Sequence, residues 1–175
     1  MVLAPASSAE AQSAPAALRV ESRPSTPEDR AFLRALFFEA KRTEGPAGAW
    51  PEELLAMQFL ARERGYQGQF PQAQDRILLV GGEPVGRLWV APEEGAWQVI
   101  DVAVSKGWGR RGVATAALLA FRAEVNHARL RLQVVAGNPA QRLYQRLGFV
   151  VVATDPVRIS MEWSPGVPKA PGRDS

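Results

Sequence analysis

The chain has 175 residues, of which 46% are hydrophobic and 22% are charged, with a net charge of +3. This composition is typical of a soluble globular protein, and the length suffices for one domain with a full core but not for two ordinary domains. Because the chain has no cysteine, disulfides, thiolate zinc sites and cysteine nucleophiles are excluded, and we expect a cytoplasmic protein.

The two ends of the chain differ in composition from its middle. The first residues, MVLAPASSAEAQSAPAA, are rich in Ala, Ser and Pro, with neither a basic start nor a long apolar run. They therefore resemble neither a secretory signal nor a membrane span. We expect disordered tails over residues 1–16 and 165–175, and one domain over residues 17–164 that no repeat or linker divides.

The first half of this domain predicts one strand and two helices. Alternating apolar and polar residues predict a strand over Leu18–Ser22. A helix follows over about Pro27–Arg42, because Thr26 is a good N-cap and Asp29 occupies the capping-box position. A second helix starts near Pro51 and continues to about Arg64.

The second half predicts a sheet interrupted by helices. Strands Arg76–Val80 and Pro84–Val90 flank the turn Gly81-Gly82, and a third antiparallel strand ends at Val104. After a long helix, the strand Leu130–Val135 should lie parallel to that central strand, since a helical crossover joins them. The remaining elements are a short helix between Asn138-Pro139 and Gly148, and strands Phe149–Ala153 and Val157–Trp163. The predicted class is α/β (α+β), with a mixed sheet of about seven strands and about four helices.

A glycine-rich basic turn, Ser105–Ala114, joins the buried central strand to the long helix. The first amides of a helix have no internal partners and carry roughly half a positive charge, so they are suited to bind phosphate. Three glycines allow close approach of a ligand and three basic residues add charge: Gly107, Gly109, Gly112, Lys106, Arg110 and Arg111. The turn predicts a pyrophosphate-binding site.

Two other nucleotide-binding motifs fit this turn less well. Gly107-Trp-Gly109-Arg-Arg-Gly112 satisfies G-x-G-x-x-G, but that fingerprint also needs a carboxylate about twenty residues further on. The next strand instead leads into Ala136-Gly137-Asn138, which has none. A kinase-type phosphate loop is disfavoured because no Gly-Lys-Ser/Thr follows.

Two segments resemble the GCN5-related N-acetyltransferase (GNAT) family. Arg111-Gly112-Val113-Ala114 resembles the family's acetyl-CoA signature, and Gly137–Phe149, GNPAQRLYQRLGF, resembles its second signature. Both occur in the family's order, and the resemblance covers about Ala17–Trp163. It implies a single GNAT domain in which acetyl-CoA lies where the central strand and its parallel neighbour splay apart.

The resemblance also implies a set of site residues. Tyr144 would protonate the leaving thiolate or donate a hydrogen bond to it. Two departures matter: the leading Arg/Gln position of the first signature falls on Gly109, and Asn138 lies one residue closer to Tyr144 than usual. The cofactor-binding residues implied are Val102, Ala103, Val104, Gly109, Arg110, Arg111, Gly112, Val113, Ala114, Thr115, Asn138 and Tyr144.

The general base is less clearly marked. The histone-acetylating branch has a Glu where this chain has Gln98, which cannot accept a proton. Asp101 is the only carboxylate on the central strand and is the predicted base, provided that a β-bulge turns it to the face of Gln98. The alternative for Asp101 is a structural role in which it bonds to neighbouring backbone. Glu39 and Glu44, on the acceptor side, are further candidates for the base. The helices around residues 27–64 would wall the acceptor site, with Phe37, Phe38, Trp50, Met57 and Phe59 as candidate lining residues.

The sequence thus predicts an acetyl-CoA-dependent N-acetyltransferase that acts by direct transfer to a primary amine, without a metal. The alternative is a non-catalytic sensor or scaffold of the same fold that binds acyl-CoA. Basic residues predominate between Asp101 and Arg146, but no aromatic-basic interleaving supports nucleic acid binding. No membrane partner is expected, and the resemblance is compatible with a homodimer.

Overall fold

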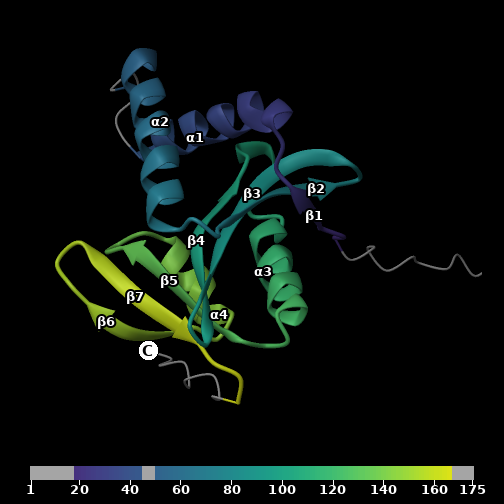
Figure 1. Cartoon of the computed structure of the whole chain (residues 1–175), viewed down its shortest axis with the longest axis vertical. Helices are drawn as coiled ribbons and strands as arrows, with labels where there is room; N and C mark the ends of the chain where they lie inside the picture. The colour runs from purple at the N-terminus through teal and green to yellow at the C-terminus, as the bar shows by residue number, and fades with distance from the viewer. Residues whose placement is uncertain (1–17, 45–49, 167–175) are drawn as a thin grey trace, which may run out of the picture.

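The structure, a computed structural model, describes residues 18–44 and 50–166. Over these residues the chain forms a seven-stranded mixed sheet and four α-helices (Figure 1). The elements are β1 Glu21–Pro24, α1 Arg30–Glu44, α2 Glu52–Gln69, β2 Gln74–Val80, β3 Glu83–Glu93, β4 Ala96–Val104, α3 Val113–Glu124, β5 Arg129–Val135, α4 Ala140–Arg146, β6 Val150–Thr154 and β7 Arg158–Trp163. Two 3₁₀ turns, Pro27–Asp29 and Lys106–Trp108, precede α1 and follow β4.

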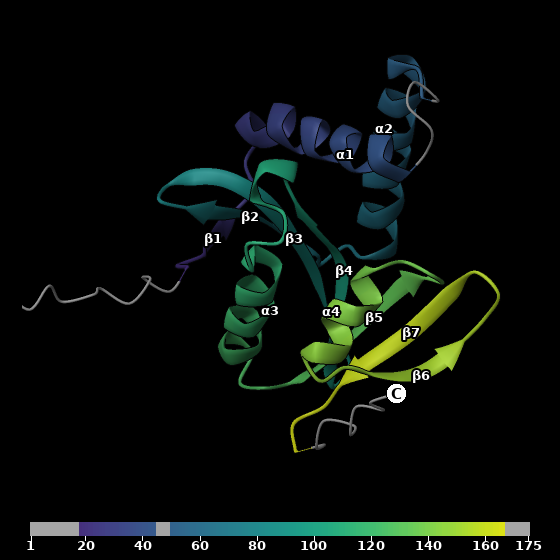
Figure 2. The same cartoon turned by 180° about the vertical axis from the view of Figure 1, so that it is seen from behind.

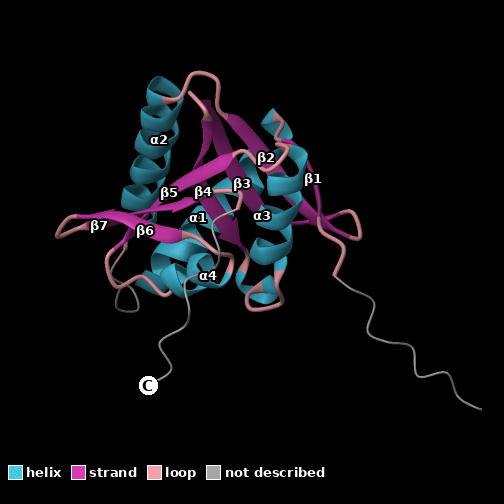
Figure 3. Cartoon of the chain, turned by 90° about the horizontal axis from the view of Figure 1, so that it is seen from below, coloured by secondary structure: helices cyan, strands magenta, loops and turns pink. Residues whose placement is uncertain are grey.

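The sheet order is β1-β2-β3-β4-β5-β7-β6, and every neighbouring pair is antiparallel except β4 and β5. The parallel pair is joined through α3, as a parallel connection requires. This topology confirms the predicted fold class, including the antiparallel meander and the parallel partner of the central strand. The long strands β3 and β4 cross the middle of the molecule between α2 and α3 (Figure 3).

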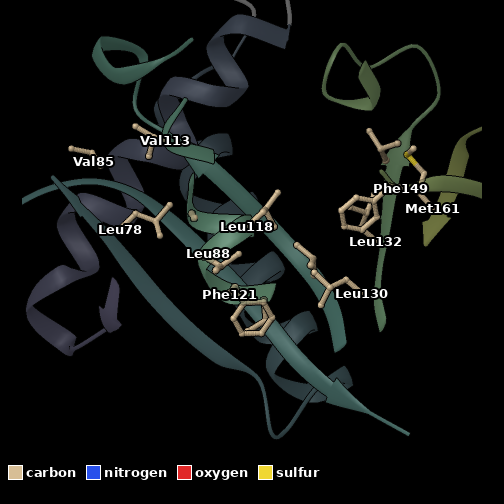
Figure 4. Close-up of a cluster of buried hydrophobic side chains, with 14 residues drawn as sticks. Leu78, Val85, Leu88, Val113, Leu118, Phe121, Leu130, Leu132, Phe149 and Met161 are labelled. Carbon is tan, nitrogen blue, oxygen red and sulfur yellow. The ribbon is translucent and has the colours of Figure 1, made fainter. Parts of the chain in front are cut away.

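Helices cover both faces of the sheet. One face packs against α3 and α4 (Figure 2), through a core cluster that includes Leu88 and Val99 of the strands and Phe121 of α3. Phe149 and Met161 close this cluster at its other end (Figure 4). The opposite face carries a smaller cluster made mainly by α1 and α2: Leu33, Phe37, Phe38, Leu55, Phe59 and Ile77.

Several predicted boundaries differ from the observed ones, and two of them have a clear structural reason. The first strand is β1, which begins at Glu21 rather than Leu18, because Glu21 already pairs with Leu79 near the end of β2. Helix α2 continues past the predicted end at Arg64 to Gln69. The extra turns are stabilised by tertiary packing, since the Tyr66 ring lies 5.3 Å from the Trp89 ring on β3.

The predicted disordered tails, residues 1–16 and 165–175, lie outside the described residues except for the turn at residues 165–166. The break between the first two helices also falls on residues that the structure does not describe. Within the described ranges, no helix combines the length and the apolarity that are needed to cross a membrane.

The start of α1 is fixed by one buried carboxylate. Asp29 accepts hydrogen bonds from Arg23 (Nη1 at 2.6 Å and Nη2 at 2.7 Å) and from the backbone N–H of Thr26 at 2.8 Å. The Arg23 guanidinium, aided by the Thr26 N–H, holds the pKa of Asp29 well below its usual range. This carboxylate closes the predicted capping box and ties β1 to the first helix.

We expect Asp29→Asn to lower the free energy of unfolding by about 1–2 kcal/mol near neutral pH. Because the folded-state pKa is lowered, this stabilisation is present above the ordinary carboxyl pKa and is lost as pH falls toward the folded-state value. Denaturant titrations of both proteins at neutral and acid pH measure the difference. A difference that does not shrink on acidification would contradict this account.

Candidate active site

A cleft opens where β4 and β5 part. The two strands pair only from Ala96 with Arg129 to Val99 with Leu132, and beyond that point they diverge (Figure 1). The C-terminal half of β4 therefore has a strand partner only on its β3 side. The space is about 580 Å³ and reaches from α1 and α2 to α4; its lining includes Leu33, Leu36, Phe37, Arg62, Tyr66, Asp101, Val102, Ala103, Val104, Gln133, Asn138 and Tyr144.

A β-bulge at Ile100 sets the direction of Asp101. Trp89 on β3 pairs with Asp101, whereas the next residue, Val90, pairs with Val99, so Ile100 is the extra residue. Val99 before the bulge and Val102 after it both pack in the core cluster beneath α3. Asp101 must therefore lie on the opposite face, toward α1 and α2.

The bulge is the condition on which the prediction for Asp101 depended. It brings Asp101 to the face of Gln98, since Gln98 precedes the buried Val99 and Asp101 precedes the core-facing Val102. Gln98 nevertheless lines a smaller neighbouring cavity instead of the cleft. Of these two polar residues of β4, only Asp101 reaches the cleft.

Asp101 pairs with one residue of the cleft, and its charge acts on a second. Its Oδ2 lies 2.6 Å from Nη2 of Arg62 on α2, in an ion pair whose side chains are 21% and 25% exposed. Burial raises the pKa of Tyr144 to about 12, with a further contribution from the negative charge of Asp101. The carboxylate therefore interacts with a cation from one wall and with a phenol from the other.

Tyr144 projects from α4 against the core, with its ring 5.8 Å from the ring of Phe149. Among the described residues, its hydroxyl has no hydrogen-bond partner, and the residue lines the cleft. A neutral phenol is a hydrogen-bond donor, and its raised pKa keeps it neutral throughout the physiological pH range.

Among the described residues, the basic turn contains a run of backbone amides without a protein acceptor. Arg110 and Gly112 adopt positive φ angles of 60° and 84°, and Gly112 is the N-cap of α3. Within the described parts of the chain, the N–H groups of residues 110–115 donate no hydrogen bond to protein. Left-handed residues among successive free amides make an anion-binding concavity. Arg111 lies over the ring of Trp108, with its Cζ 5.0 Å from the centroid, so Trp108 packs on the turn itself.

The predicted site residues thus fall into two groups. The cleft contains Asp101, Val102, Ala103, Val104, Asn138 and Tyr144. The turn residues Gly109–Thr115 do not line the cleft; they follow β4 and lead into α3.

Three polar residues proposed from the sequence have other partners or are not described. Asn138 Oδ1 accepts a hydrogen bond from the N–H of Ala140 at 2.9 Å, which leaves both N–H groups of its side-chain amide for a ligand. Glu39 accepts a hydrogen bond from the N–H of Lys106 at 2.8 Å, which ties α1 to the end of β4. The side chain of Glu44 lies outside the described part.

Most of the residues predicted to line the acceptor site do not reach the cleft. Only Phe37 lines the cleft; Phe38 and Phe59 are buried in the α1–α2 cluster and Trp50 packs against it. Met57 is 68% exposed and points away. Sequence reasoning missed Arg62 and Tyr66, because they lie on a helix without a motif and reach the site only through tertiary packing.

Comparison with known families places an acetyltransferase domain over this site. The model of the "Acetyltransferase (GNAT) domain" matches residues 73–151, which include both signature segments and the whole of β4 and α3. The resemblance to the GNAT family is therefore confirmed for this part of the chain. A search of curated proteins found no match.

Solved structures show the same fold. An acetyltransferase from Thermus thermophilus is 23% identical, with a TM-score of 0.65 over 84% of this chain and 97% of that one. The PaiA N-acetyltransferase from Thermoplasma acidophilum, solved in complex with coenzyme A, is 17% identical, with a TM-score of 0.65 over 84% and 99%. At these identities the likeness establishes the fold, and the family match supports acyl transfer from acetyl-CoA.

Proposed function

We propose that this chain, whose residues 73–151 match the GNAT acetyltransferase domain, is an N-acetyltransferase that transfers the acetyl group of acetyl-CoA to a primary amine. The main support is that Asp101 and Tyr144 line the same cleft between the diverging ends of β4 and β5, and that the charge of Asp101 contributes to the raised pKa of Tyr144. A carboxylate and a neutral phenol in one cleft can serve opposite ends of an acyl transfer, one as a base and the other as a hydrogen-bond donor.

The residues present fit coenzyme A. The free amides of residues 110–115 would receive the pyrophosphate, and Arg110 and Arg111 would add positive charge. The open edge of β4 at Val102–Val104 could pair with an extended ligand as an added strand does. Acetyl-CoA supplies the acyl group as a thioester.

Asp101 would act on the acceptor. An ordinary amine has a pKa of about 10.4, so freeing its lone pair near neutral pH costs about 4 kcal/mol. A carboxylate that receives this proton directly or through one water lowers the cost at the moment of attack. Asp101 is the carboxylate on the cleft wall of β4, and we assign it this role.

Tyr144 would act on the leaving sulfur. A thiol has an ordinary pKa of about 8.5, whereas burial and the charge of Asp101 raise the pKa of Tyr144 to about 12. Complete proton transfer from Tyr144 to a thiolate is then uphill by roughly 5 kcal/mol. We therefore assign Tyr144 the role of hydrogen-bond donor to the developing thiolate, with solvent as the final proton source.

A thiol-release assay with acetyl-CoA and a panel of amines tests the proposed function. The panel should contain amino acids, polyamines, aminoglycosides and lysine-containing peptides. Amine-dependent release of CoA is the expected result. Acetyl-CoA binding by calorimetry without release for any amine would instead indicate the non-catalytic sensor or scaffold.

We expect Tyr144→Phe to lower kcat by about 10- to 100-fold, the value of one charge-assisted hydrogen bond. The dissociation constant of acetyl-CoA should change little, because the ring and its packing against Phe149 remain. Steady-state kinetics and calorimetry measure the two effects separately. Unchanged turnover would remove Tyr144 from the mechanism.

A further inference from the structure

Arg62 lines the cleft, and its guanidinium has one ion-pair partner in the part of the chain that the structure describes. Its Nη2 lies 2.6 Å from Asp101, and its Cζ lies 5.5 Å from the ring centroid of Phe37 and 5.6 Å from that of Tyr66. The aromatic rings fix the guanidinium in place by cation–π contacts. Among the described residues its only polar partner is Asp101, so the guanidinium is open to a ligand carboxylate that displaces Asp101.

Arg87, the other arginine that lines the cleft, is held by two carboxylates of the protein. It donates four hydrogen bonds of 2.7–3.1 Å, two to Glu63 and two to Asp75, and its side chain is only 3% exposed. A buried arginine held between two carboxylates has a structural role. Arg62 differs in both respects, because it is partly exposed and has a single ion-pair partner.

We propose that Arg62 binds a carboxylate of the acceptor, and that the acceptor is a free α-amino acid. This inference rests on the proposed N-acetyltransferase activity and names the substrate class of the same cleft. A planar guanidinium can bind a carboxylate through two parallel hydrogen bonds. Because Asp101 lies beside Arg62, an ammonium group next to that carboxylate meets Asp101.

When an amino acid binds, the Arg62–Asp101 ion pair is replaced by two new ion pairs, so every charge keeps a partner. The acceptor carboxylate takes the place of Asp101 at Arg62, and Asp101 pairs with the acceptor ammonium that it then deprotonates. An acceptor with only positive charges would draw Asp101 away and leave Arg62 unpaired in a partly desolvated cleft, which is costly. The nearby side chains of Leu33, Leu36 and Phe37 favour an apolar amino acid over a charged one.

The test compares acceptors that share one side chain. Leucine, leucinamide and 3-methylbutylamine, with the matching series for methionine and phenylalanine, are assayed by thiol release with acetyl-CoA. We expect kcat/KM for the amino acid to exceed that for its amide and its decarboxylated amine by about 10- to 100-fold, the value of one charged contact. Most of this preference should appear in KM.

Arg62→Gln should abolish the preference, and Arg62→Lys should retain part of it, since lysine keeps the charge but loses the planar fork. Arg64→Gln is the matched control, because Arg64 lies on the same helix, is exposed and does not line the cleft. The control should keep the selectivity of the unmodified protein. Calorimetry with acetyl-CoA and thermal unfolding show whether each variant is folded.

The outcomes separate this inference from the proposed function. If amides, simple amines or polyamines are acetylated as well as amino acids, the carboxylate-binding role of Arg62 is wrong and the N-acetyltransferase activity stands. That role is equally wrong if Arg62→Gln keeps the preference for amino acids. If acetyl-CoA binds but no amine in the panel releases CoA, the proposed function itself is wrong.

Discussion

Gly112→Val is expected to abolish detectable acetyl-CoA binding, with a dissociation constant at least about 100-fold higher, because two or more charge-assisted hydrogen bonds are lost. Gly112 has a φ of 84°, which a β-branched residue rarely adopts. A Cβ at this position would meet no protein atom within 4 Å. The side chain would thus enter the open space beside the turn whose amides we assign to the pyrophosphate.

Backbone strain and loss of ligand space can be separated by a matched glycine. Gly82, in the turn between β2 and β3, has a φ of 82° and equally open surroundings. Gly82→Val carries a comparable strain of about 1–2 kcal/mol but lies outside the cleft and the basic turn. Calorimetry should show normal acetyl-CoA affinity for Gly82→Val, while thermal unfolding shows a similar loss of stability for both variants. Normal affinity of Gly112→Val would exclude the turn as the pyrophosphate site.

The features that could be predicted from the sequence are those fixed by local patterns. The apolar run of β4, the glycines of the turn and the helical spacing of α3 lie next to one another in the chain, so periodicity and turn chemistry identify them. The hairpin at Gly81-Gly82 follows from the same local chemistry. These segments make up the fold around the cleft, so the fold could be predicted from local patterns alone.

The site itself depends on features that have no local signature. The bulge at Ile100 is a mismatch between two strands, and nothing in the composition of β4 marks the extra residue. Without that bulge, Asp101 would point into the core beneath α3. The Arg62–Asp101 ion pair joins a helix to a strand through tertiary packing, so one sequence cannot show it. The same holds for the end of α2. Gly65 and Gly68 disfavour a helix there, but the Tyr66–Trp89 contact stabilises it.

Asp101→Asn should lower kcat by about 10²- to 10⁴-fold, the usual contribution of a general base. Asparagine has nearly the same shape but cannot accept the proton, so the affinity for acetyl-CoA should change little. Glu94→Gln provides a matched change of charge, because Glu94 is exposed in the turn between β3 and β4, away from the cleft. Steady-state kinetics of both variants, with a saturating amine, measure the difference.

The same substitution has a spectroscopic consequence that does not depend on turnover. Because the charge of Asp101 contributes to the raised pKa of Tyr144, its removal makes the phenolate less unfavourable and lowers that pKa. The pKa should stay above its ordinary value, since burial, the larger cause, remains. The chain has two tyrosines, so titration of tyrosinate absorbance in a Tyr66→Phe background reports Tyr144 alone. An unchanged pKa would show that Asp101 and Tyr144 do not interact across the cleft, and normal turnover of Asp101→Asn would assign the base to another group.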